Sequence, residues 1–211
     1  MKFKLPPKVD KVTYVQIYYP KASKKIQHEF LNTWQTWIDE VDENINLNGG
    51  LYNTLDDGVY AYARGISYKN IEETQKFLEP FYNIQGAKIY LEYELFLEVV
   101  NKIASGYTPY EHFKLTGRFV NRYYKSREIS NLVDIVNQNR HKGSILTSVN
   151  IYGLGGKVKD IGNCDSAYYY RDANYILLIQ SIWEDNVYKK ENVDWVLEIL
   201  NIFMILQKAH I

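Results

Sequence analysis

The chain has 211 residues, of which 46% are hydrophobic and 24% are charged. These fractions exclude intrinsic disorder, collagen-like repetition and a disulfide-stapled miniprotein, and the length favours a single domain, 1–211, with residues 1–10 as an N-terminal tail. Lys and Arg together number 25 and so do Asp and Glu. Because this balance includes no long basic run, we expect no nucleic-acid partner.

The cysteine and histidine content indicates the compartment and argues against a metal site. Cys164 is the only cysteine, so it has no partner for an internal disulfide, and the four histidines lie far apart in the sequence. We therefore expect an intracellular, cytoplasmic protein without a metal centre. The N-terminus lacks the apolar segment of a secretion signal, and no stretch approaches the roughly 18 apolar residues of a membrane helix, which predicts no membrane partner.

The first half of the sequence predicts the order β-α-β-β-α. Residues 12–19 are β-branched and aromatic and end at a proline, which is typical of a strand. Residues 22–41 carry apolar side chains every three or four positions, the spacing of one helical face. Strands are expected over 44–54 and 58–67, joined as a hairpin by an Asp-Gly turn. A second helix should follow over 70–81, because Asn70 is a helix-capping residue.

The second half predicts the same order again. A connecting region, 85–110, carries a short helical pattern around Leu95–Ile103. The elements expected after it are a strand over 112–120, a helix over 129–136, strands over 144–152 and 174–183, and a helix over 191–207.

This order predicts an α+β fold with two β-α-β-β-α units, a ferredoxin-like duplication. Hairpins mixed with helical connections favour a mainly antiparallel sheet with the helices on one face. The other face would then be open, and the chain's 20 tyrosines fall mostly in the alternating segments. Since an exposed aromatic face suits a ligand or a protein partner, we expect a bound small molecule or a homo-oligomer formed through this face.

Motifs of intrinsic catalysis are absent from the sequence. There is no glycine-rich phosphate loop, no GxSxG nucleophile motif, no HExxH and no CxxC. We therefore assign no catalytic, cofactor-binding or metal-binding residue to this chain.

Four segments carry a resemblance to a known family. The segments are WQTWID (34–39), FKLTGRFV (113–120), the stretch from NIYGLGG to SIWED (150–185), and ENVDWV (191–196). In this order they resemble the substrate domain of FAD-linked oxidases of the berberine-bridge-enzyme type. The resemblance covers about residues 10–200 and looks closest to the members from spore-forming bacteria.

The resemblance implies a substrate-binding half of an oxidoreductase. In the family a separate domain holds FAD, a small-molecule substrate transfers hydride to the flavin, and dioxygen reoxidises it. The family's flavin-binding domain and its C-terminal return segment have no counterpart in this sequence. We therefore expect this chain to bind no FAD alone, to need a flavin-binding domain or subunit as partner, and to lack activity without it.

Five residues are candidates for substrate binding. In the strand 174–183, side-chain alternation places Ile176, Leu178 and Gln180 on one face, opposite to the terminal tryptophan, and Tyr152 of a neighbouring strand should join them. Ile176 stands where plant members of the family have a glutamate base, so Gln180 is the polar group left on that face. Lys114 matches the family's Phe-Lys motif.

Two other functions remain open at this point. The chain could be a stand-alone remnant that acts as a structural or interaction protein, for example in a spore coat. It could also be an autonomous domain that binds a small molecule.

Overall fold

The first half of the chain folds in the order that its residue pattern predicts. Ser23 begins the first helix, because its side chain accepts a hydrogen bond from the backbone N–H of Ile26. Asn70 begins the next helix in the same way, by accepting from the N–H of Glu73. The elements are β1 (Lys11–Tyr19), α1 (Lys24–Glu40), β2 (Ile45–Thr54), β3 (Gly58–Ser67), α2 (Ile71–Phe77) and α3 (Glu79–Tyr82).

The second half repeats this order after a connecting strand and helix. The connecting elements are β4 (Lys88–Leu95) and α4 (Phe96–Ala104). The repeat consists of β5 (His112–Val120), α5 (Ser126–Val136), β6 (Ser144–Gly153), β7 (Tyr175–Trp183), the short 3-10 helix η2 (Asn186–Tyr188) and α6 (Lys189–Lys208).

The computed structural model describes residues 9–106, 111–154 and 158–208, and side chains up to residue 202. Most of the expected N-terminal tail, 1–10, and the glycine pair at 155–156 therefore lie outside the described residues.

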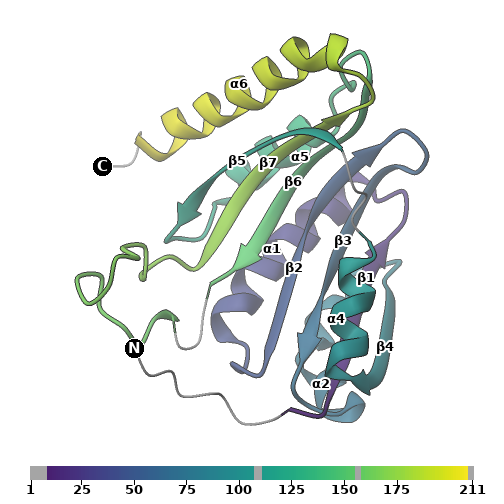
Figure 1. Ribbon diagram of the computed structural model, residues 1–211, viewed down its shortest axis with the longest axis vertical. Helices are drawn as coiled ribbons and strands as arrows, with labels where there is room; N and C mark the ends of the chain where they lie inside the picture. Colours follow the sequence, from purple (N-terminus) through teal and green to yellow (C-terminus); the bar gives the residue numbers. More distant parts are fainter. Residues whose placement is uncertain (1–8, 107–110, 155–157, 209–211) are drawn as a thin grey trace.

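The strands of the described residues join one seven-stranded antiparallel sheet, in the order β4-β1-β3-β2-β6-β7-β5. In each unit the last strand lies between the other two, as β1-β3-β2 and as β6-β7-β5. The two units meet where β2 pairs with β6. The expected α+β class, the antiparallel sheet and the duplication are thus confirmed (Figure 1).

The main core lies between the sheet and helices α1, α5 and α6. Phe30 and Trp34 of α1 are fully buried, and they pack with Leu51 of β2 and Leu177 of β7 in one hydrophobic cluster. Burying apolar surface in such a cluster is the main stabilising contribution to the fold. The helices α1 and α5 therefore lie on one face of the sheet, behind it in Figure 1.

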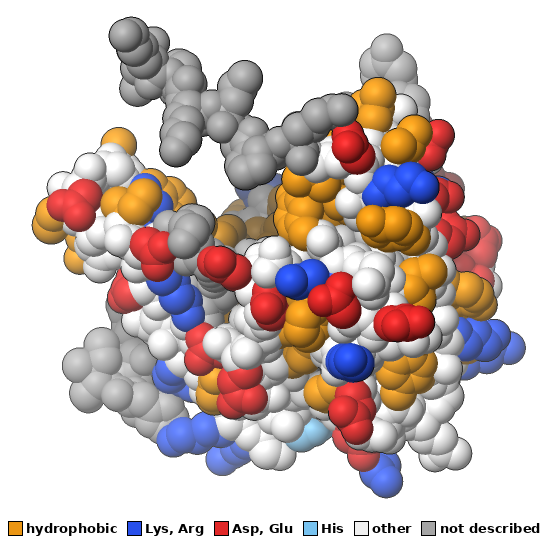
Figure 2. Space-filling model, turned by 90° about the horizontal axis from the view of Figure 1, so that it is seen from below, with side chains coloured by type: hydrophobic (Ala, Val, Ile, Leu, Met, Phe, Trp, Pro, Cys, Tyr) orange, Lys and Arg blue, Asp and Glu red, His pale blue; other side chains and the backbone are white. Residues whose placement is uncertain are grey.

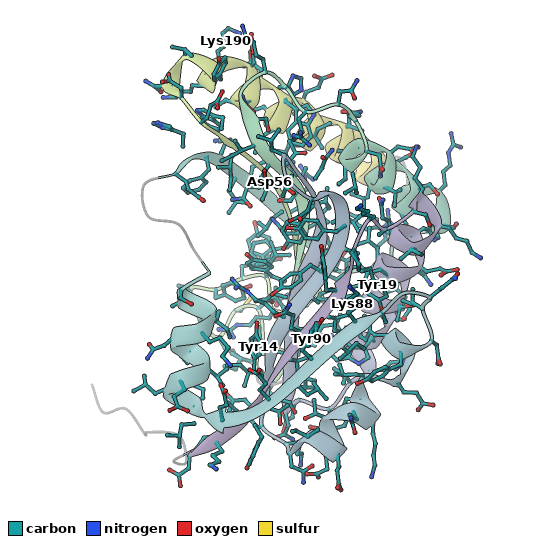
Figure 3. The ribbon with its side chains drawn as sticks, turned by 90° about the vertical axis from the view of Figure 1, so that its right-hand side faces the viewer. Tyr14, Tyr19, Asp56, Lys88, Tyr90 and Lys190 are labelled. Atoms are coloured by element: carbon teal, nitrogen blue, oxygen red, sulfur yellow. The ribbon has the colours of Figure 1, made fainter. Side chains whose placement is uncertain are left out.

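The connecting region departs from the expected one-sided arrangement. The helix expected around Leu95–Ile103 is confirmed as α4, but the strand β4 before it was not predicted. The helix α4 lies on the open face, where Val99 packs on Val12 and Tyr14 of β1. Figure 3 shows the two faces of this strand, with Tyr14 on the side of α4 and Tyr19 on the opposite side. The open face is thus covered at the β1 and β4 end.

No helix within the described part of the chain is long and apolar enough to cross a membrane. On the face seen in Figure 2, acidic and basic side chains are interspersed rather than gathered by sign. This distribution agrees with the balanced composition and offers no basic stripe to a nucleic acid on that face.

Candidate functional site

A cavity of about 640 Å³ lies on the open face of the sheet. Its floor consists of side chains from β2, β3, β6 and β7, the four central strands that carry the junction of the two units. Ile103 and Gly106, at the C-terminal end of α4, form one wall. The volume falls within the usual range for small-molecule sites.

Tyrosine side chains form one side of the cavity. The rings of Tyr52 and Tyr60 stack nearly parallel, with centroids 5.3 Å apart, and Tyr62 meets Tyr52 edge to face at 6.2 Å. Tyr18 of the neighbouring strand β1 packs edge to face against Tyr60, with ring centroids 5.4 Å apart. Burial, together with the charge of nearby Asp57, raises the pKa of Tyr60 to about 12. Burial also raises the pKa of Tyr52 and Tyr62, so these phenols are neutral at physiological pH.

The floor of the cavity contains a small hydrogen-bond network across β6 and β7. Asn150 Nδ2 donates to Ser148 Oγ at 3.0 Å and to Gln180 Oε1 at 3.4 Å. Ser148 Oγ lies 3.5 Å from the same oxygen of Gln180 and donates to it. Asn150 is only 3% exposed, and its Oδ1 has no hydrogen-bond partner among the described residues.

The wall formed by α4 is held to the sheet by Lys102. Its ammonium donates to Glu92 and to Glu94 of β4, at 2.8 Å in the second case, and lies 5.4 Å from the ring centroid of Tyr14. The hydrogen bonds that Lys102 donates to the carboxylates of Glu92 and Glu94 raise its pKa. Lys102 therefore ties the helix to the sheet edge one residue before Ile103, which lines the cavity.

Replacing Lys102 by methionine should loosen α4 without unfolding the sheet, because the ion pairs are partly exposed and the core does not depend on them. We expect faster backbone amide exchange in α4 and unchanged exchange in β2 and β6, measured by hydrogen–deuterium exchange. Lys190→Met is the control, since it removes a surface ion pair to Asp194 on α6 instead. Equal exchange of α4 in both variants would contradict this role.

The sequence-based candidates fall into three groups in the structure. Tyr152 and Gln180 line the cavity. Ile176 and Leu178 lie on the same face, because they pair with Tyr152 and Asn150, but they are not among the residues that line the cavity. The fifth candidate, Lys114, is placed differently.

Lys114 lies on the face of the sheet opposite to the cavity. It pairs with Ser181 of β7, whose hydroxyl donates to Asn192 of α6 at 2.7 Å on the helix-covered face. The neighbours of Lys114 in β5, Phe113 and Leu115, alternate to the open face instead. Lys114, which was expected to bind substrate because it matches the family's Phe-Lys motif, therefore lies on the other face of the sheet from Gln180 and the cavity.

Several lining residues were not selected from the sequence. They are the stacked tyrosines Tyr52 and Tyr60, the neighbouring Tyr62 and Arg64, and Asn150. The sequence could have grouped three of them, because side-chain alternation in β3 places positions 60, 62 and 64 on one face. Which face that is depends on the position of the helices, and the strand by itself does not specify it.

The lining of the cavity is mostly neutral. Among the described residues that line the cavity, only Arg64 and Glu111 carry a charge, and the polar remainder consists of amides and phenols. The described part of the chain contains no group of His, Cys, Asp and Glu side chains arranged to hold a metal ion. The cavity can therefore orient a mostly neutral ligand through stacking and hydrogen bonds.

Comparisons with known proteins identify related folds but no related sequence. No protein-family model matches the chain, and no curated protein matches it. A BBE-like protein from Arabidopsis thaliana superposes with a TM-score of 0.75 at 14% identity, over 92% of this chain and 42% of that chain. Berberine bridge enzyme from Eschscholzia californica gives 0.74 at 13% identity, over 90% and 40%. A glucooligosaccharide oxidase from Acremonium strictum gives 0.68 at 17% identity, over 82% and 38%.

These matches confirm the expected resemblance to berberine-bridge-type oxidases at the level of the fold. The chain spans about two fifths of the length of these structures. Nothing in the comparisons supports the expected closeness to spore-forming bacteria or a place in a spore coat.

Proposed function

We propose that this chain is the substrate-binding half of an FAD-linked oxidoreductase, in which the cavity holds a small molecule over the flavin of a separate flavin-binding domain. That domain would lie on the same polypeptide or on another subunit. The observation that carries the proposal is the superposition of 92% of this chain on 42% of a BBE-like structure, together with a cavity on the open face.

The cavity has the position and lining that such a role needs. It opens on the sheet face opposite to the main core, so a second domain could cover it without disturbing the helices. Its neutral phenols and amides can orient a substrate and exclude water, while FAD, when bound by the other domain, would accept the hydride. No side chain of this chain is assigned as the base, and Ile176 has no ionisable group to act as one.

An apolar strip beside the cavity suits contact with a second domain. Phe113 and Leu115 of the edge strand β5 lie on the open face and are 55% and 40% exposed. Phe119 of the same strand stacks on Tyr170, with ring centroids 4.1 Å apart, and Tyr170 is 49% exposed. Exposed apolar side chains gathered beside a cavity are typical of an interaction surface.

The lining fits a flat ring better than the diphosphate of FAD. Arg64 is the one cationic side chain among the described lining residues. A diphosphate is normally held by a glycine-rich turn that leads into a helix, and the sequence contains no such motif. The site thus suits a flat substrate, while FAD would be held by the separate flavin-binding domain.

Adding FAD to the isolated chain should produce no saturable binding, because the diphosphate has no cradle here. Co-expression with a flavin-binding domain encoded beside this chain should yield a yellow complex that purifies as one species. Flavin absorbance and fluorescence measure both results. A stoichiometric complex of FAD with this chain alone, with a dissociation constant of about 1 µM or below, would contradict the proposal.

A pair of variants keeps the co-expression result interpretable. Phe113→Asp places a charge on the apolar strip and should abolish the complex, while Lys190→Met on α6 should leave it intact. Circular dichroism would show that both variants remain folded. Failure of the unmodified chain to associate with the flavin domain would refute the proposed division of roles.

A further inference from the structure

Each of two neighbouring amide side chains on the floor of the cavity has one polar atom without a hydrogen-bond partner among the described residues. Gln180 Oε1 accepts from Asn150 Nδ2 and from Ser148 Oγ, whereas Gln180 Nε2 donates to none of the described residues. Both amide hydrogens of Asn150 are used, one toward Ser148 and one toward Gln180, whereas its Oδ1 has no partner among the described residues. One donor and one acceptor, from adjacent strands, are thus left over.

One donor and one acceptor are left unpaired whichever way the amide oxygen and nitrogen atoms are assigned. If Gln180 and Asn150 were both rotated by half a turn, Gln180 Nε2 would donate to Asn150 Oδ1. The atoms left over would then be Gln180 Oε1 and Asn150 Nδ2, which again are one acceptor and one donor. One unpaired donor and one unpaired acceptor are therefore present in both cases. Only the residue that carries each of them changes.

An unused polar atom at this depth requires an explanation. Asn150 is 3% exposed, and an unsatisfied amide group in such a position is unfavourable relative to one that is hydrogen-bonded in water. Its neighbours offer no further partner within the described structure. The oxygen itself is almost fully covered, so the Asn150 side chain must rotate slightly toward the cavity that it lines before a ligand can reach it. A ligand that donates one hydrogen bond and accepts another beside it would then satisfy both amides at once.

We infer that the cavity takes an uncharged, flat ligand with an amide edge, that is, a ring in which a C=O stands next to an N–H. An amide edge has one donor and one acceptor, so it complements the two unused groups in either orientation of the side chains. The inference deepens the proposed function, on which it rests for the identity of the cavity as the substrate site.

The rest of the lining favours a flat and neutral ring. The stacked pair of Tyr52 and Tyr60 and the edge of Tyr62 offer aromatic surface beside the amides. These phenols are uncharged at physiological pH, and burial raises their pKa further from it, so they offer a cation no negative charge. Ile66, Leu146 and Ile182 add apolar contact around the same space.

The test titrates three flat probes into the whole chain and follows the signals of Gln180 and Asn150 by NMR. Quinolin-2(1H)-one has the amide edge, 1-methylquinolin-2-one lacks its N–H, and 2-naphthol has a hydroxyl in place of the amide. We expect quinolin-2(1H)-one to bind in the cavity and both other probes to bind at least about tenfold more weakly. Because this comparison uses the unmodified chain, it needs no variant to fold.

Variants locate the effect. Gln180→Leu should weaken quinolin-2(1H)-one about tenfold or more and leave the melting temperature nearly unchanged, because its two hydrogen bonds are long. Gln75→Leu on α2 is the control, since it makes the same substitution at an exposed residue that does not line the cavity. The affinity of the control variant for quinolin-2(1H)-one should stay within about twofold of that of the unmodified chain.

The outcomes separate this inference from the proposed function. Equal binding of all three probes in the cavity would overturn the amide-edge inference and leave the cavity as a substrate site. Failure of all three probes to shift the signals of Gln180 and Asn150 would also overturn it, while the complex with the flavin domain tests the proposed function independently.

Discussion

Replacing Trp34 by alanine should remove about 4 kcal/mol from the free energy of unfolding, which is the usual loss for a large core aromatic side chain. Trp34 is fully buried, and its ring meets Tyr175 of β7 edge to face, with centroids 5.5 Å apart and an interplanar angle of 89°. It therefore joins α1 of the first unit to the sheet of the second. Since domains of this size are stable by roughly 5–15 kcal/mol, the variant should be largely unfolded at moderate temperature. Urea denaturation followed by circular dichroism measures the change.

Trp34→Phe is the matched control for this substitution. The indole Nε1 is buried and has no hydrogen-bond partner among the described residues, so phenylalanine loses ring volume but no hydrogen bond. We expect Trp34→Phe to lower the free energy of unfolding by less than half as much as Trp34→Ala does. Similar denaturation midpoints for the alanine variant and the unmodified chain would show that the two units do not depend on this contact.

Gly50→Ala should disrupt the junction between the two units and with it the floor of the cavity. A Cβ atom at this position would lie 2.2 Å from the carbonyl oxygen of Val149 and 2.9 Å from the Cα of Asn150, both in the backbone of β6. Backbone atoms cannot move aside as a flexible side chain does, so β2 and β6 must separate. We expect a loss of about 3 kcal/mol in the free energy of unfolding, measured by urea denaturation.

Gly106→Ala is the control for this clash, because it tests the same change against a mobile neighbour. A Cβ atom there would lie 2.7 Å from Nη1 of Arg64, the far end of a long side chain. Its stability should change by less than about 1 kcal/mol. If both variants were equally stable, the close approach of β2 and β6 would not be a constraint on the fold.

The order of the elements could be predicted from local pattern, because the relevant forces act over a few residues. The strand expected over 112–120 is β5, and the pair expected over 44–54 and 58–67 forms the hairpin of β2 and β3. The caps of α1 and α2 follow from Ser23 and Asn70 in the same way. Repetition of this order was sufficient to predict the duplicated antiparallel sheet.

The connecting region could not be predicted as fully, since its structure depends on distant partners. Among the described strands, β4 is an edge strand that pairs only with β1. Its Ile89 and Leu91 pack against the main core, while Glu92 and Glu94 lie on the face of α4, where they bind Lys102. The position of α4 on the open face is decided by the packing of Val99 on Val12 and Tyr14, about 85 residues away along the chain.

The sequence by itself determined which residues share a face, because side chains in a strand alternate with a period of two. Gln180 was placed with Ile176 and Leu178 on this ground, and the structure puts all three on the face of the cavity. Only the tertiary structure decided which face each strand turns to the helices, since that depends on the register between strands. Lys114 shows the difference: alternation correctly separates it from Phe113 and Leu115, but only its pairing with Ser181 places it on the helix-covered side. The tyrosine stack and the unused amide of Asn150 likewise arise only when strands distant in the sequence lie side by side.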